Sequence, residues 1–141
     1  MKHVWKLLTL LVALLIFFSS SIEGELSGNA SLAIAARLRE IFPLAYDTLN
    51  FIVRKIAHFM VFFLLAFCAV NALKHHTQKA PLMGWGFATV YAIFDEIHQY
   101  FVPGRVFAVT DILIDSAGAL AGAFTAYMLI KKNILSPSKI A

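Results

Sequence analysis

Four carboxylates lie in the second half of the chain at spacings that place them near one another. Asp95 and Glu96 are adjacent, and Gln99 follows Asp95 by four residues. Asp111 and Asp115 are also four residues apart. Residues separated by four share one face of a helix, so Asp111 and Asp115 share a face, as do Asp95 and Gln99, whereas Glu96 lies on the adjacent face. Such groups are suited to acid–base chemistry, cation binding or ion pairing.

Basic side chains that could face these carboxylates occur at two places. Arg54, Lys55 and His58 lie in one apolar stretch, and Arg54 and His58 share a helix face. Arg105 follows the Val102-Pro103-Gly104 segment, whose Pro and Gly are typical of a turn. His98 adds a second imidazole beside Asp95. Guanidinium groups bind carboxylates and phosphates through paired hydrogen bonds, so an anion site is one possible chemistry.

The cluster has two interpretations, because four nearby carboxylates repel unless cations, protons or a metal neutralise them. One is a buried ion-pair network that fixes helix register. The other is a polar pocket that serves as a proton relay, a metal site or an anionic-headgroup site. The spacing permits a metal without being diagnostic, so we predict no metal and no other cofactor. The residues assigned to ligand binding are Arg54, His58, Asp95, Glu96, Gln99, Arg105, Asp111 and Asp115.

The composition indicates which kind of element carries this cluster. The chain has 141 residues, of which 60% are hydrophobic and 14% charged, and its mean hydropathy is +0.78. A soluble domain of this size is excluded, since it could not bury so much apolar surface. Disorder is excluded for the same reason.

We predict an all-α, polytopic integral membrane protein with one domain, 1–141, and four transmembrane helices at 4–20, 51–73, 80–101 and 106–130. The first of these could instead be a cleaved signal peptide.

The segment 21–50 between the first two spans is predicted to contain a further short helix. Asn29 or Ser31 could cap it, and Pro43 would end it near Phe42. Apolar residues occur on one side and charged residues on the other. We therefore expect an amphipathic helix at the outer surface, most simply as a cover over the bundle.

Lysine positions predict the orientation of the spans. Cytoplasmic loops of membrane proteins are enriched in Lys and Arg. The N-terminus, the segment 74–79 and the C-terminal tail must share one side, and they hold seven lysines and no acidic residue. We therefore place the N- and C-termini in the cytoplasm and the carboxylate cluster outside. The net charge of +4 is then an orientation signal and does not indicate nucleic-acid binding.

Gly118 and Gly122 continue the helix face that carries Asp111 and Asp115. Small residues four apart allow another helix to approach closely in a membrane. We interpret the two glycines as packing residues. They are expected to bring the fourth span close to the third, so that the two pairs of carboxylates meet.

The second half of the chain resembles a known family. The pattern Asp-Glu-x-x-Gln-x-Phe-x-Pro-Gly-Arg, five further residues and Asp-x-x-x-Asp-x-x-Gly-x-x-x-Gly extends from Asp95 to Gly122. It is similar to the signature of VanZ-like membrane proteins, and the resemblance covers roughly Leu7 to Ile130. Members often carry a glutamate where this chain has Val61, which weakens a catalytic role for His58. Many members have asparagine where this chain has Asp115.

The resemblance implies a small, multi-pass protein of the bacterial inner membrane, with a glycopeptide-resistance role of the teicoplanin type. The outer cluster would bind or modulate an envelope component, such as an anionic lipid, a wall precursor or a glycopeptide. One alternative is an enzyme acting on an envelope lipid, with candidate catalytic residues Asp95, Glu96 and His58. Another is a small proton-coupled transporter. Membrane lipids are expected partners, nucleic acids are not, and homo-oligomerisation stays open.

Overall fold

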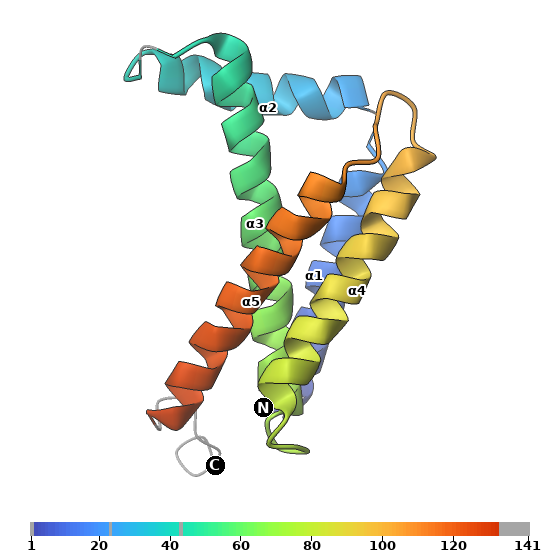
Figure 1. Ribbon diagram of the computed structural model, residues 1–141, viewed down its shortest axis with the longest axis vertical. Coiled ribbons are helices and arrows are strands. Elements are labelled where there is room, and N and C mark those ends of the chain that lie inside the picture. Colours follow the sequence, from blue (N-terminus) through green and yellow to red (C-terminus); the bar gives the residue numbers. More distant parts are fainter. Residues whose placement is uncertain (1, 23, 43, 133–141) are drawn as a thin grey trace.

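The computed structural model describes residues 2–22, 24–42 and 44–132, and in these residues all regular structure is α-helical. Helices α1, α3, α4 and α5 form a bundle, and α2 lies across one end of it (Figure 1). The all-α prediction is therefore confirmed. The helices in this part of the chain are α1 (Lys2–Ser20), α2 (Gly24–Arg39), α3 (Tyr46–Leu73), α4 (Ala80–Tyr100) and α5 (Val109–Lys131).

Two helix starts differ most from the predicted bounds. Helix α3 begins at Tyr46, five residues before the expected apolar start, and Asp47 in its first turn favours a helix N-terminus electrostatically. Helix α2 begins at Gly24, before the expected caps Asn29 and Ser31, and ends at Arg39. Apolar content alone does not define a helix start, because polar residues extend α3 beyond its hydrophobic part.

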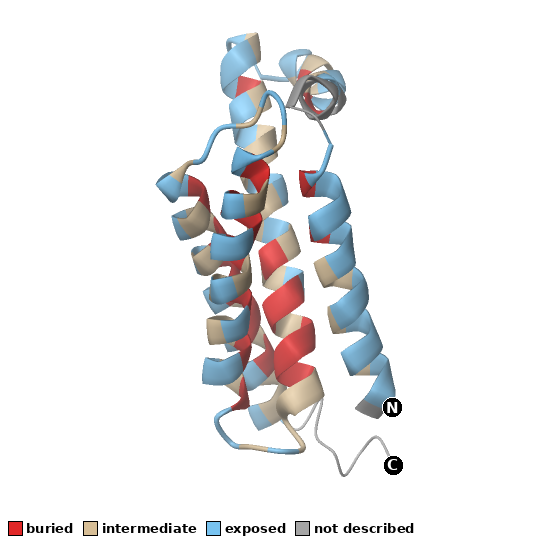
Figure 2. Ribbon diagram, turned by 90° about the vertical axis from the view of Figure 1, so that its right-hand side faces the viewer, coloured by how far each residue is buried: buried red, intermediate tan, exposed pale blue. Residues whose placement is uncertain are grey.

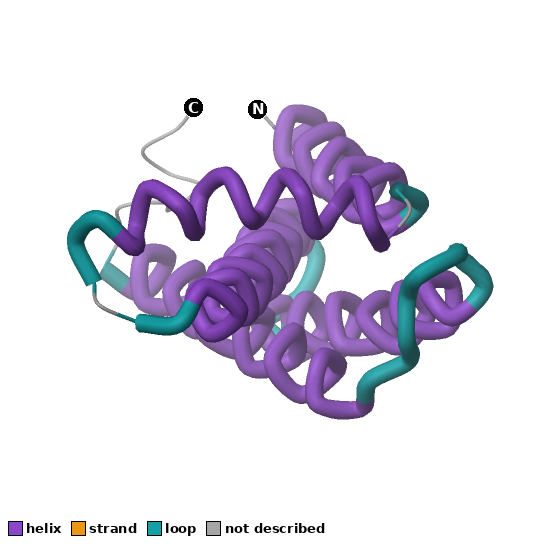
Figure 3. The backbone as a smooth tube through the Cα atoms, turned by 90° about the horizontal axis from the view of Figure 1, so that it is seen from above, coloured by secondary structure: helices purple, strands orange, loops and turns teal. Residues whose placement is uncertain are grey.

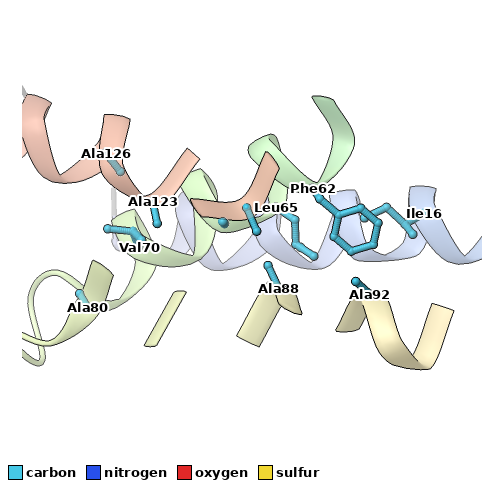
Figure 4. Packing of buried hydrophobic residues seen from close by; sticks show 11 residues of the cluster. Ile16, Phe62, Leu65, Val70, Ala80, Ala88, Ala92, Ala123 and Ala126 are labelled. Atoms are coloured by element: carbon cyan, nitrogen blue, oxygen red, sulfur yellow. The ribbon is translucent and has the colours of Figure 1, made fainter. Parts of the chain in front are cut away.

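Helix α3 is the centre of the bundle. It contacts each of the other four helices, and the view along the bundle shows them arranged around it (Figure 3). Its buried side chains Phe62, Leu65 and Val70 face alanines of α4 and α5, with Ile16 of α1 at one end of the cluster (Figure 4). Alanines on the facing helices leave room for these larger side chains, so α3 supplies much of the bulk of the core.

The outer faces of the helices are apolar and exposed. Burial is concentrated towards the inside of the bundle, and the outward faces are exposed (Figure 2). Leu10, Phe94 and Phe124 are each more than half exposed, as are many other large apolar side chains. Apolar surface of this extent is unfavourable in water and favourable in lipid. The fold therefore fits a membrane better than an aqueous phase.

Three of the described helices, α1, α3 and α5, are long and apolar enough to cross a membrane by length and composition. Helix α4 is of similar length, but its last turns carry Asp95, Glu96, His98 and Gln99, which lower its hydropathy. The number of four membrane spans therefore stays a prediction. The position of α2 at a membrane surface also stays a prediction.

Two glycines of α5, Gly118 and Gly122, pack directly against the backbone of α3. A Cβ atom added to Gly118 would lie 2.2 Å from the carbonyl oxygen of Phe59, and one added to Gly122 would lie 2.1 Å from that of Phe63. Both distances are far below van der Waals contact. The sequence predicted that these glycines would pack against the third span, which corresponds to α4. This was wrong, because their side of α5 faces the backbone of α3. Gly84 of α4 packs in a similar way against Val70 of α3.

Candidate functional site

Helices α3 and α5 hold a buried pair made by His58 and Asp115. His58 Nδ1 lies 3.3 Å from Asp115 Oδ1, and Asp115 is fully buried. The angles are not those of a hydrogen bond, and among the described residues neither carboxylate oxygen of Asp115 has a hydrogen-bond partner. His58 is the side chain placed to stabilise this carboxylate electrostatically, since burying an unpaired charge is costly.

A second pair joins the same two helices closer to the end that α2 covers. The Lys55 ammonium donates to Asp111 Oδ1, and the Thr110 hydroxyl also donates to this oxygen, at 3.3 Å. The Lys55 and Asp111 side chains are partly buried. The spacing of four between Asp111 and Asp115 therefore matches two successive contacts with α3, at Lys55 and His58.

Glu96 is bonded to the loop between α4 and α5 and forms no salt bridge with the described residues. It is fully buried, and the backbone N–H of Ala108 donates to its Oε2 atom at 2.9 Å. Ala108 immediately precedes α5. The carboxylate thereby ties the end of α4 to the start of α5, and this contact is structural in character.

Asp95 and Gln99 form a further polar group at the end of α4, next to α1. Gln99 Nε2 donates to Asp95 Oδ2 at 2.8 Å and lies 3.4 Å from the hydroxyl oxygen of Ser20. Arg105 Nη1 donates to Gln99 Oε1 at 3.3 Å. The side chains of Ser20 on α1 and of Asp95 and Gln99 on α4 are all buried. His98 lies apart from them, stacked on Phe17 of α1 with ring centroids 4.7 Å apart.

Neither Arg54 nor Arg105 forms a salt bridge with a carboxylate among the described residues. Among the described residues Arg54 has no hydrogen bond or salt bridge, and Arg105 makes no salt bridge. Arg105 instead donates to neutral oxygens: Gln99 Oε1 and the backbone carbonyls of Ser19 and Ile22, each at 3.3 Å. Burial lowers the pKa of Arg105 and the positive charge of Arg54 lowers it further, whereas the charges of Asp95 and Glu96 oppose this lowering. The Arg105 guanidinium stays protonated near pH 7.

Two cavities lie beside these arginines, and both arginines line both of them. The larger cavity, of about 350 Å³, lies among α1, α2, α3 and α4, and its wall is mainly apolar with His58 and Asp95 among the polar residues. The smaller cavity, of about 310 Å³, lies at the end of the bundle and is lined by Lys55, Asp111 and other polar groups. The arginines therefore mark the boundary between an apolar space and a polar one.

The structure thus divides the predicted cluster into two functional types. Asp111 and Asp115 pair with basic side chains of α3, which supports the ion-pair interpretation for these two. Asp95 and Glu96 instead bond to neutral groups. Arg54 and Arg105 form no salt bridge with the described residues and line both cavities. No three or more His, Cys, Asp or Glu side chains in 2–22, 24–42 and 44–132 are arranged to hold a metal ion, so this part of the chain gives no support to the metal alternative.

Sequence reasoning did not assign two residues of this site. Lys55 was considered only as a source of positive charge, yet it pairs with Asp111. Ser20 is 5% exposed, lies against Gln99 and lines the larger cavity. The polar run Ser19-Ser20-Ser21 at the end of an apolar helix could have indicated that Ser20 belongs to the site. Serines at the end of a membrane helix can face a polar cluster on a neighbouring helix.

The fold and the site define an all-α protein suited to a membrane, with a charged cluster between its helices. The chain belongs to the VanZ/LLP1 family, whose family model matches residues 5–131. This confirms the resemblance carried by the Asp95–Gly122 pattern, and the match includes all the site residues described above. No curated protein and no solved structure matches the chain significantly.

Proposed function

We propose that this VanZ/LLP1 protein acts at the bacterial cell envelope by binding an anionic envelope component at Arg54 and Arg105, in a glycopeptide-resistance role of the teicoplanin type. The observation that carries the proposal is the absence of a salt bridge for either arginine among the described residues, although four carboxylates lie nearby. Each of those carboxylates has another partner. Two cations of like charge held close together are stabilised by an anion placed between them.

The chemistry of the two side chains fits this role. A guanidinium group presents a planar fork of N–H donors that binds carboxylate or phosphate oxygens in pairs. A hydrogen bond to a charged group contributes about 1.5–3 kcal/mol. Arg105 is held in position by three bonds to neutral oxygens. Arg54 has its donors free of bonds to described residues, so an incoming anion can use them.

We expect Arg54→Gln to weaken anion binding at least tenfold and to leave folding nearly unchanged. The tenfold loss corresponds to about 1.4 kcal/mol, the lower end for a charged hydrogen bond. Folding should be unaffected because Arg54 makes no hydrogen bond or salt bridge to the described residues, and removing it relieves repulsion with Arg105. Binding of glycerol 3-phosphate to the purified protein in detergent, together with the unfolding temperature, checks this.

Arg37→Gln provides the matched control, since Arg37 is an exposed arginine on α2 that lines neither cavity. It should leave both binding and the unfolding temperature unchanged. Teicoplanin susceptibility of cells that express each variant gives the cellular readout. Equal binding by wild type and Arg54→Gln would contradict the proposal, as would a large loss of stability in Arg54→Gln.

We expect the cluster to face the outside of the cell. The start of α1, the turn between α3 and α4 and the end of α5 lie at one end of the bundle (Figure 1), where Lys6, Lys74, Lys79 and Lys131 are found. A periplasmic reporter fused after Lys132 should be inactive, and a cytoplasmic reporter fused there should be active. The opposite pattern would place the arginines inside and contradict an envelope-facing role. Helix α4 returns from the end of α3 to the start of α5 at the opposite end of the bundle, which supports four spans (Figure 1).

The second candidate is an enzyme that acts on an envelope lipid, and the His58–Asp115 pair is the observation that favours it. A buried carboxylate 3.3 Å from an imidazole that lines a cavity is an arrangement related to those used in general acid–base catalysis. Glu96 is less suited to this role than predicted, because it lines neither cavity and bonds to Ala108. Lipid turnover by the purified protein that depends on His58 would favour the enzyme over simple binding.

A further inference from the structure

We propose that the bound component is an anionic, phospholipid-like amphiphile, with its phosphate between Arg54 and Arg105, its hydroxyl-bearing headgroup in the smaller cavity and its hydrocarbon chain in the larger one. The inference rests on the proposed anion binding and adds the chemical class of the ligand. It starts from one feature of the fold, which is that the same two cations line an apolar cavity and a polar cavity.

The larger cavity suits a hydrocarbon chain. Leu15, Ile16, Ile34, Val61 and Phe62 contribute its apolar wall from α1, α2 and α3. Helices α1 and α3 are among those apolar enough to cross a membrane, so in a membrane the cavity would be next to the hydrocarbon phase, from which a lipid chain could enter. A soluble anion would leave this apolar space unused, whereas the chain of a lipid would fill it.

The smaller cavity suits a headgroup that carries hydroxyl groups. Asn50 lines it, and its Oδ1 atom is buried with no hydrogen-bond partner among the described residues. A buried acceptor without a partner is costly, and a ligand hydroxyl would satisfy it. Lys55 and Asp111 on the same wall add a donor and an acceptor.

The position of the charge distinguishes a phosphate ester from a fatty acid. In a phospholipid the phosphate lies between the hydrocarbon part and a polar headgroup, which is the order found along the two cavities. A fatty acid ends at its carboxylate and would leave the smaller cavity empty.

The test is photolabelling of the full chain in phosphatidylcholine vesicles. The probe is phosphatidylglycerol with a diazirine in its acyl chain, and the comparison probe is phosphatidylcholine with the same chain. We expect phosphatidylglycerol to label the larger cavity, at Val61 and Ile34, at least fivefold more than phosphatidylcholine. Leu10 and Phe124, on exposed faces of the bundle, should be labelled equally by both. Equal labelling of the cavity by the two probes would overturn the inference.

Two variants on neighbouring positions of α3 separate the cavity from the lipid-facing surface. Ala57 lines the larger cavity, and Ala57→Phe should reduce cavity labelling severalfold by filling the space. Ile56 is 57% exposed and lines neither cavity, so Ile56→Phe should label like wild type. Val61→Phe fills the same cavity one turn further on and replaces Ala57→Phe if that variant does not fold.

Binding of glycerol 3-phosphate separates failure of this inference from failure of the proposed function. If the soluble anion binds in an Arg54-dependent way but Ala57→Phe does not lower labelling by phosphatidylglycerol, the anion site stands and the lipid assignment is wrong. If neither glycerol 3-phosphate nor phosphatidylglycerol depends on Arg54, the proposed function itself is wrong. Arg54-dependent labelling that Ala57→Phe abolishes, with glycerol 3-phosphate binding retained, supports both.

Discussion

Gly122→Ala should lower the free energy of unfolding by about 3 kcal/mol or more, at or above the upper end for overpacking. The added methyl would lie 2.1 Å from the carbonyl oxygen of Phe63. Because this neighbour is backbone, no change of side-chain rotamer can relieve the clash, and α5 would have to move away from α3. The lysine and histidine contacts of α3 to Asp111 and Asp115 would lengthen with it. Unfolding by sodium dodecyl sulfate in mixed micelles measures the loss.

Gly86→Ala is the matched control, since it makes the same chemical change on α4. A Cβ atom there would meet nothing within 4 Å. Its stability should be unchanged or raised by up to about 1 kcal/mol, the helix-propensity difference between glycine and alanine. If the two variants behave alike, the α3–α5 contact does not set the stability of the bundle, and the position of the carboxylates must depend on other contacts.

The sequence was sufficient to predict the helices and the residues of the cluster, because both depend on local features. Runs of apolar residues located α1, α3, α4 and α5, and the spacing of four between Asp111 and Asp115 gave their shared face. The pattern from Asp95 to Gly122 also identified the family. Each of these inferences requires only one segment of chain at a time.

The partners of the charged groups could not be predicted in the same way, because they depend on which helices touch. The sequence suggested that Arg54, Lys55 and Arg105 could all supply positive charge to the carboxylates, without saying which of them would do so. In the structure Asp111 pairs with Lys55, whereas Arg54 faces the cavities without a salt bridge among the described residues. Adjacent residues of a helix differ in direction by about 100°. Small differences in helix rotation therefore decide which of Arg54 and Lys55 meets a carboxylate.

The glycines show the same limitation. A stripe of small residues predicts that some helix comes close, but it does not name that helix. Gly118 and Gly122 admit α3 rather than α4 because α3 is central and α5 packs along it. As a consequence Asp111 contacts Lys55 and Asp115 contacts His58, both on α3, and the arginines are left for another role.

His58→Leu should be the most damaging single change within the cluster, with an expected loss of about 3–5 kcal/mol. It leaves Asp115 fully buried on α5 without its salt-bridge partner, and no other described side chain takes that place within 4 Å. Asp115→Leu should cost less, because the His58 side chain is 18% exposed and can stay uncharged. The unfolding free energies of both variants and wild type, measured in mixed micelles, give the comparison.

The double variant His58→Leu/Asp115→Leu should recover most of this loss, since replacing both members of a buried pair by apolar residues is often neutral. His98→Leu controls for the loss of an imidazole. Because His98 contacts only Phe17 and the exposed Ser21 hydroxyl among the interactions of the described residues, this substitution should lower the free energy of unfolding by less than about 1 kcal/mol.

The double variant also separates the two candidate functions. A stable double variant that still binds anions through Arg54 would place His58 in the framework of a binding protein. One that binds but loses lipid turnover would make His58 part of an active site.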